Sequence, residues 1–221
     1  MEIFCTKHTD PKECGKYCIG RIQMSNIYKL SNMPKRFRKE IRLKPDPEDV
    51  EKFLQLKEWQ DNVVENVRQG KGLFIYGETK GTGKTTWACK IMNSYFKHIA
   101  LTNNLECRGL FVNVPQFFQE LKNSFDNPSE EFQEFLDNIK SADLVIWDDI
   151  GTESPTRFVR DTLYTFIDYR YANEKSQIFT SNVSLEQLRH EDWLGDRIVS
   201  RILGSCLVIK LESRVDKRVV Q

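Results

Sequence analysis

Short apolar runs alternate with longer mixed stretches from about residue 48 to the end of the chain. The apolar runs predict strands, because each is four to seven residues long and ends in a polar or glycine-containing turn. They cover residues 73–76, 110–114, 143–149, 177–182 and 206–211. The stretches between them predict helices, at about residues 48–69, 84–99, 115–125, 130–140, 156–172 and 184–203. Strands that are apolar on both faces and separated by helices predict an α/β fold, a parallel five-stranded sheet with helices on both faces.

The N-terminal part of the chain lacks this alternation. Residues 1–25 are rich in Cys and His and predict a small separate head. Residues 26–47 predict a basic linker, because residues 29–44 contain seven basic residues, one acidic residue and little hydrophobic periodicity. Such a linker either contacts nucleic acid or an acidic partner surface, or is simply solvated. The remaining residues, 48–221, are the predicted main domain.

Composition narrows the class of protein. The 221 residues are 39% hydrophobic and 29% charged, which is typical of a globular domain and not of a disordered chain. No apolar run approaches the ~18 residues that span a bilayer, and the first residues do not resemble a signal peptide. These observations predict a cytoplasmic protein without a membrane partner. Because the net charge is only +1, any nucleic-acid binding must come from local basic patches.

The segment GETKGTGKT, residues 77–85, follows the first predicted strand and precedes a helix. Such a loop surrounds a triphosphate with backbone N–H groups, Lys84 reaches the β- and γ-phosphates, and the Thr85 hydroxyl ligates Mg²⁺. The predicted nucleotide-binding residues are Gly77, Lys80, Gly81, Thr82, Gly83, Lys84, Thr85 and Thr86. Five residues separate Gly77 from Gly83 where four are usual, which predicts a bulge near Thr79 or Lys80. The alternatives are a simple strand-to-helix turn and a loop that binds nucleotide poorly.

Polar side chains end two later strands. LVIWDD places Asp148 and Asp149 where parallel sheets carry their sites, so we predict that Asp148 holds the Mg²⁺ shell and Asp149 is the general base. The alternative is two aspartates that only begin a turn. The strand QIFTSN ends in Asn182, which is predicted to position the attacking water, although Thr-Ser-Asn also suits a helix cap.

The N-terminal head contains two close pairs of soft ligands. Cys5 with His8, and Cys14 with Cys18, predict one structural Zn²⁺ with four protein ligands. Reduced thiols and a surface histidine are the alternative.

Several motifs together resemble the AAA+ ATPases of the DnaC/DnaI type, the bacterial and phage loaders of the replicative helicase. The matching segments are NMPKRFR, GETKGTGKT, VIWDDIGTE, IFTSN and GDRIVSRI, within roughly residues 26–218. The phosphate loop is common to P-loop ATPases, whereas DDIG followed by TSN and GDRIVSRI is much more specific. The resemblance implies a small zinc-binding head that grips the helicase, and an ATPase domain without a full helical lid.

The resemblance also implies roles for individual residues. Asp148 and Asp149 match the acidic pair of the family, and Asn182 matches its first sensor. Arg201 resembles the arginine finger that reaches the ATP of a neighbouring subunit, with Arg197 as the alternative. Arg214 resembles the second sensor, with Arg218 as the alternative.

The implied function is ATP-dependent loading of the hexameric replicative helicase onto single-stranded DNA during replication initiation. The implied cofactors are ATP, Mg²⁺ and structural Zn²⁺, and the implied partners are the helicase, single-stranded DNA and further copies of the chain. We expect slow ATP hydrolysis that assembly or single-stranded DNA stimulates. The alternatives are a transposition-helper ATPase of the IstB type and a non-hydrolysing, nucleotide-dependent adaptor.

Overall fold

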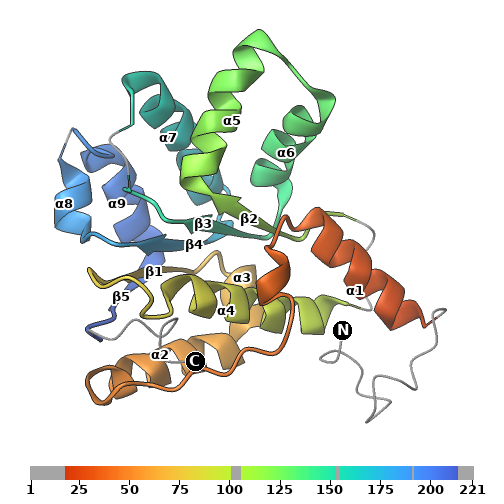
Figure 1. Ribbon diagram of the computed structural model, residues 1–221, viewed down its shortest axis with the longest axis vertical. Coiled ribbons are helices and arrows are strands. Elements are labelled where there is room, and N and C mark those ends of the chain that lie inside the picture. Colours follow the sequence, from red (N-terminus) through yellow and green to blue (C-terminus); the bar gives the residue numbers. More distant parts are fainter. Residues whose placement is uncertain (1–17, 101–105, 153–154, 191, 214–221) are drawn as a thin grey trace.

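A computed structural model describes residues 18–100, 106–152, 155–190 and 192–213 of the chain. Its centre is a five-stranded parallel sheet with the strand order β2-β3-β4-β1-β5 (Figure 1). The strands are β1 (Gly72–Tyr76), β2 (Gly109–Asn113), β3 (Leu144–Asp148), β4 (Ser176–Ser181) and β5 (Cys206–Lys210). The predicted fold class and all five predicted strands are therefore confirmed.

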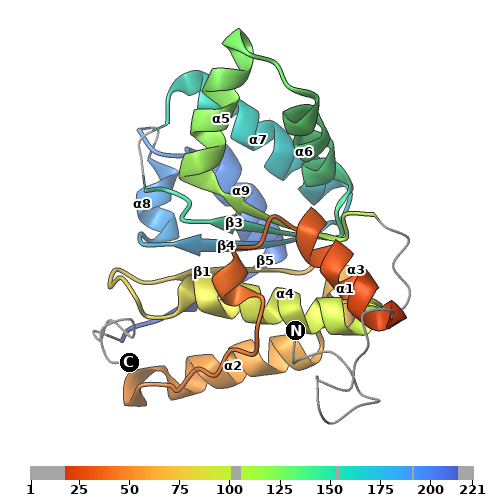
Figure 2. The same ribbon diagram turned by 45° about the vertical axis from the view of Figure 1, so that its right-hand side comes forward.

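Helices cover both faces of the sheet, as Figures 1 and 2 show from two directions. The helices of one face are α1 (Ile19–Leu30), α2 (Val50–Asp61), α3 (Val63–Arg68) and α4 (Lys84–Ile99). The helices of the other face are α5 (Val114–Asp126), α6 (Glu130–Ser141), α7 (Arg157–Ala172), α8 (Leu185–Arg189) and α9 (Asp196–Ser205). Two short 3₁₀ turns, η2 (Lys35–Phe37) and η3 (Pro47–Asp49), precede α2.

Alternation along the strands divides the core into two layers. In β1, Leu73 and Ile75 pack with the α1–α4 layer, whereas Phe74 packs with the α5–α9 layer. In the same second layer, Trp147 of β3 stacks on Phe179 of β4 with ring centroids 6.5 Å apart. Because both faces of β1 to β4 are covered, nearly all of their residues are buried and their central residues are apolar, which explains why their sequences predicted a parallel sheet.

Two predicted helices are interrupted in the structure. The helix predicted at 48–69 is divided into η3, α2 and α3, and the Asn62 side chain donates a hydrogen bond of 3.0 Å to the Glu58 carbonyl at the break. The helix predicted at 184–203 is divided into α8, which ends before His190 at ψ 142°, and α9, which begins after Gly195 at φ +82°. Hydrophobic spacing alone therefore predicted two continuous helices, whereas local polar contacts and glycine geometry divide them in the structure.

The N-terminal segment contains a helix that the sequence analysis did not predict. Met24, Ile27 and Tyr28 are buried on one face of α1, at the helical spacing of three and four. The basic segment that follows also packs on the core, through buried Met33 and Phe37. Met33 and Phe37 are thus packed residues within the predicted basic linker, and two buried side chains among many charges leave almost no periodic signal in the sequence.

The C-terminal end of α1 is attached to the sheet edge. The backbone N–H of Phe111 in β2 donates to the carbonyl of Ser31, at 2.8 Å. The Asn32 side chain also donates to the Phe111 carbonyl, at 3.3 Å. Within the described ranges, no helix combines the length and the apolar character that crossing a bilayer requires.

Candidate functional site

The glycine-rich loop joins β1 to α4, as the sequence predicted. Gly81 and Gly83 take φ of +77° and +101°, a left-handed backbone that favours glycine. Gly77 is required for a different reason, because a Cβ atom there would lie 2.3 Å from the Leu211 carbonyl oxygen. The loop therefore turns tightly and delivers the chain to the N-terminus of α4, where unpaired backbone N–H groups favour an anion.

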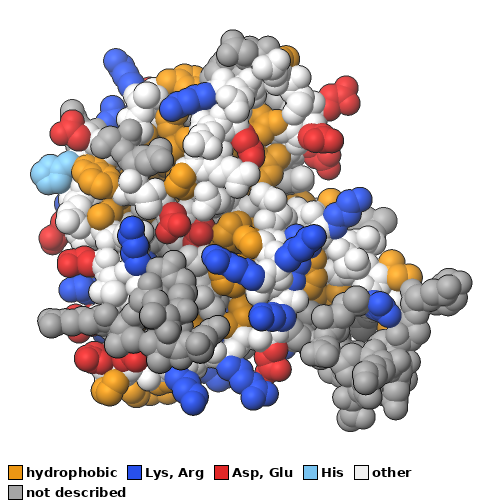
Figure 3. Space-filling view, viewed as in Figure 1, with side chains coloured by type: hydrophobic (Ala, Val, Ile, Leu, Met, Phe, Trp, Pro, Cys, Tyr) orange, Lys and Arg blue, Asp and Glu red, His pale blue; other side chains and the backbone are white. Residues whose placement is uncertain are grey.

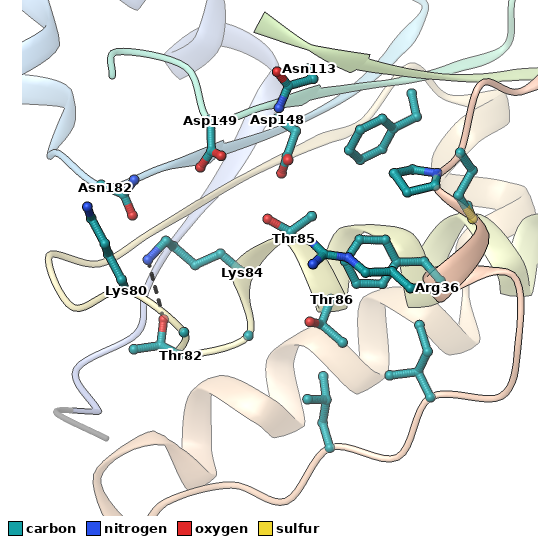
Figure 4. A pocket seen from close by; sticks show the side chains of 18 of the residues that line it. Arg36, Lys80, Thr82, Lys84, Thr85, Thr86, Asn113, Asp148, Asp149 and Asn182 are labelled. Carbon is teal, nitrogen blue, oxygen red and sulfur yellow. Dashed lines mark hydrogen bonds between the residues drawn. The ribbon is translucent and has the colours of Figure 1, made fainter. Parts of the chain in front are cut away.

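Lys84, the first residue of α4, closes the loop on itself. Its buried ammonium donates to the carbonyl oxygens of Gly77 at 2.8 Å and Thr79 at 2.9 Å, and to the Thr82 hydroxyl at 3.4 Å (Figure 4). The Thr79 carbonyl, near the predicted bulge, therefore faces the lysine. A phosphate that enters this loop competes with these oxygens for the same ammonium donors.

Asp148 and Asp149 lie at the C-terminal end of β3 and point into the space above Lys84 and Thr85 (Figure 4). Thr180, at the end of the adjacent strand β4, connects them. Its hydroxyl donates to Asp148 Oδ1 at 2.7 Å and accepts from the Asp149 backbone N–H at 3.0 Å. Asp149 itself takes φ +58°, a strained conformation that positions its carboxylate beside the cavity.

Burial dominates the electrostatics of the acidic pair. Burial and the neighbouring charge of Asp149 raise the pKa of the Asp148 carboxyl from 3.8 to about 6. Hydrogen bonds from Thr180 and Thr85 and the positive charge of Arg36 lower this pKa and so oppose the shift. A carboxylate that is costly to ionise, next to a hydroxyl and a second carboxylate, is a favourable partner for a divalent cation.

A cavity of about 1260 Å³ unites these elements. The predicted residues that line it are Lys80, Gly81, Thr82, Gly83, Lys84, Thr85, Thr86, Asp148, Asp149 and Asn182. Gly77 does not line the cavity, but its carbonyl accepts a hydrogen bond from Lys84. The donor set fits a magnesium nucleotide, because ammonium and backbone N–H groups face phosphate while carboxylate and hydroxyl oxygens face the metal.

The predicted arginine fingers lie elsewhere. Arg201 of α9 donates from Nε to Asp168 of α7 at 2.5 Å and does not line the cavity of its own chain. Arg197 stacks over the Tyr164 ring, 4.1 Å from its centroid. Arg214 and its alternative Arg218 lie outside the described residues.

The zinc ligands are placed only in part. Cys5, His8 and Cys14 lie outside the described residues, and Cys18 is a half-buried free thiol at the start of α1. Among the residues that the structure describes, no group of three or more His, Cys, Asp or Glu side chains could hold a metal ion.

The sequence analysis missed several residues of the site. Thr180 was treated only as part of a polar strand end, although it organises the acidic pair. The turn before α8 has its own cap, Ser184 with Gln187, and of the Thr-Ser-Asn run only Asn182 lines the cavity. Residues 32–43 form one whole wall of the cavity and include Arg36. The NMPKRFR motif was the available signal, but its distance from the loop in the sequence concealed the contact.

The glycine-rich loop, the Asp148–Asp149 pair and the polar end of β4 meet at one edge of a parallel sheet. This arrangement is that of P-loop, ATP-binding domains of the AAA+ class. Residues 59–217 match the family described as "IstB-like ATP binding protein". The chain belongs to this family.

Comparison with curated proteins shows which members of this family the chain resembles. The chain is 30% identical to "Replicative helicase loader DnaI" of Bacillus subtilis (strain 168) over 178 residues, which are 76% of this chain and 54% of that protein. It is 25% identical to "Replicative helicase loader DnaC" of Escherichia coli (strain K12), over 61% of this chain and 51% of that one. The chain thus spans about half the length of these curated relatives.

A solved structure supports the same grouping at the level of the fold. The crystal structure of the DnaC helicase loader aligns with a TM-score of 0.65 and 24% identity, over 81% of this chain and all of that one (100%). The predicted resemblance to DnaC/DnaI-type AAA+ ATPases is confirmed.

Proposed function

We propose that this chain is an ATP-dependent loader that places a replicative helicase on single-stranded DNA. One observation carries the proposal: in a relative of helicase loaders, the loop of Lys84, the Asp148–Asp149 pair and Asn182 surround a single cavity. The family also carries the name of IstB-like proteins, but the curated relatives described above are helicase loaders. The transposition-helper alternative is therefore not favoured.

The chemistry assigned to the cavity is hydrolysis of ATP at the γ-phosphate. Lys84 exchanges its loop carbonyl partners for phosphate oxygens and compensates the phosphate charge. Thr85 and Asp148 hold Mg²⁺, which supplies further charge compensation for the phosphates when it is bound. Asp149 accepts a proton from the attacking water, and Asn182, which follows the adjacent strand β4, orients that water.

Arg201 is assigned to the site of a neighbouring copy. It lies outside the cavity of its own chain, and its side chain is 34% exposed in an ion pair with Asp168 that is also 34% exposed. A partly exposed guanidinium can exchange this carboxylate for a phosphate of another subunit, where it stabilises charge only after assembly. ATP turnover should therefore require self-association, and Arg201→Ala should lower turnover without changing ATP affinity of the isolated chain.

The head is assigned to helicase binding through a zinc-stabilised fold, with Cys5, His8, Cys14 and Cys18 as ligands. Metal analysis of Cys5→Ser tests the zinc assignment. The variant should contain much less zinc than the parent, and equal zinc content would exclude Cys5 as a ligand.

The decisive test of the loader proposal is co-purification with the replicative helicase of the source organism, followed by mass measurement with and without ATP. We expect a complex of defined mass whose assembly depends on ATP. Lys84→Ala is the matched variant, because it should abolish ATP binding while the sheet and α4 stay folded by circular dichroism. Unchanged ATP affinity in this variant would exclude the assigned site. Absence of any complex, with ATP binding intact, would exclude the helicase as the partner.

Phosphate release with and without single-stranded DNA separates the loader from a non-hydrolysing adaptor. The loader should release phosphate faster when single-stranded DNA is present. Nucleotide binding without detectable phosphate release under either condition would favour the adaptor.

A further inference from the structure

Arg36 lies in the cavity wall formed by residues 32–43, and contacts with the core hold the backbone of this wall in place. Phe37 is buried, and its carbonyl accepts a hydrogen bond of 2.8 Å from the Asn93 side chain of α4. Arg38 donates from Nε to the Met33 carbonyl at 2.7 Å, which closes the turn on itself. The backbone around Arg36 is therefore fixed to the core and to the helix that carries the phosphate loop.

The Arg36 side chain, by contrast, is exposed toward the cavity. Its guanidinium lies over the Phe37 ring at 4.5 Å from the centroid and extends beside Thr85 and Thr86 (Figure 4). Its charge is near enough to Asp148 to lower the pKa of that carboxyl. Within the described part of the chain it forms no ion pair with a carboxylate. A guanidinium is thus present beside the predicted metal and phosphate positions, and no described ion pair holds it.

The charge of the expected ligand requires more cations than the loop provides. ATP has a charge near −4, and the cavity itself adds the carboxylates of Asp148 and Asp149. Lys84 already has carbonyl partners in the loop. Lys and Arg side chains gather on the central part of the face seen in Figure 3, where the wall of residues 32–43 and α4 lie. Figure 4 shows the Arg36 side chain of this wall beside Thr85 and Thr86.

We propose that Arg36 contacts the phosphates of the nucleotide bound in its own chain and is a binding residue of the ATP site. The inference rests on the proposed function, because it requires that the cavity bind ATP. The planar guanidinium offers paired N–H donors that match phosphate oxygens, and the fixed turn keeps it on the correct side of the cavity. The same segment continues backward to Ser31, at the junction of α1 with β2.

Isothermal titration calorimetry with Mg²⁺ and ATP tests the proposal on the full chain. Arg36→Ala should weaken ATP binding by about tenfold or more, the range of a lost charge-assisted hydrogen bond. Arg36→Lys should fall between the parent and the alanine variant, because lysine keeps the charge but not the paired donors. Lys29→Ala is the matched control, because it removes one exposed positive charge from α1 outside the cavity and should leave the affinity unchanged.

A second arm distinguishes a phosphate contact from an effect transmitted through Asp148. Arg36→Ala is repeated in the Asp148→Asn background and titrated with ATP in EDTA, so that the Asp148 carboxylate is absent and binding does not depend on the lost metal ligand. A loss of affinity that persists in this background supports the phosphate contact, and a loss that disappears overturns it. Unchanged affinity in folded Arg36→Ala, while Lys84→Ala abolishes binding, overturns this inference alone. Unchanged affinity in Lys84→Ala overturns the assigned ATP site itself.

Discussion

Replacement of Asp148 with asparagine should stabilise the nucleotide-free protein while it removes a metal ligand. The side chain is only 4% exposed, and its carboxyl accepts a hydrogen bond from Thr180 that an amide oxygen can accept equally well. Asparagine has nearly the same shape but carries no charge. The substitution therefore removes the buried negative charge beside Asp149 without creating a cavity.

The magnitude follows from the pKa of Asp148. Burial first, and the charge of Asp149 second, raise this pKa from 3.8 to about 6. One pKa unit corresponds to about 1.4 kcal/mol, so ionised Asp148 lowers the free energy of unfolding by about 3 kcal/mol. Between pH 3.8 and 6 the native state binds more protons than the unfolded state, so the stability of the parent decreases as the pH rises through this window.

Urea unfolding followed by circular dichroism, in EDTA and without nucleotide, measures this difference. At pH 7.5 the Asp148→Asn variant should be about 3 kcal/mol more stable than the parent. The advantage should shrink as the pH falls from about 6 toward 4, where the parent carboxyl becomes protonated. Asp149→Asn is the companion variant, because removal of its charge should lower the Asp148 pKa and move the same window to lower pH.

A variant that is less stable than the parent at pH 7.5 would refute this reasoning, as would an advantage that does not change with pH. Either result would mean that ionised Asp148 is stabilised where it lies. The Asp148→Asn variant should gain stability and lose magnesium-dependent nucleotide binding. Both results together would show that the charge of Asp148 serves the nucleotide site and lowers the stability of the fold.

Three further substitutions test how the site is supported. Thr180→Val should destabilise the fold by about 2–3 kcal/mol in urea unfolding and raise the Asp148 pKa further, because both hydrogen bonds to the acidic pair are lost; an unchanged pH profile would contradict this. Arg170→Met should lower the free energy of unfolding by about 3 kcal/mol or more, because four backbone carbonyls lose their guanidinium donor, those of Ile139, Ala142, Asp143 and Ser176. Thermal unfolding measures this as a lower midpoint, and a midpoint equal to that of the parent would show that these carbonyls find other donors. Gly77→Ala should weaken both folding and ATP binding, because its Cβ would lie 2.3 Å from the Leu211 carbonyl oxygen. A variant with normal ATP affinity and normal stability would mean that the backbone at the start of the loop shifts at little cost.

The main features of the site could be predicted because they are local in the sequence. Gly81, Gly83 and Lys84 lie within four residues, and the backbone they require is set by sterics and by the start of α4. The acidic pair ends a strand, and carboxyl ends of parallel strands meet at one edge. Thr180 and Arg36 could not be predicted in their roles, because each acts on residues at least 30 positions away in the sequence.

Hydrophobic patterning determined the five strands and their parallel arrangement, because burial on two faces leaves a mostly apolar run. The glycine-rich motif at residues 77–85 determined the phosphate loop. Hydrophobic patterning did not determine α1, where only Met24, Ile27 and Tyr28 are buried. Tertiary packing decided that residues 32–43 form a wall of the nucleotide cavity, since Phe37 and Met33 anchor that segment against the core. Packing across the sheet brings together groups that are distant along the chain, and contacts of this kind leave no periodic pattern in the sequence.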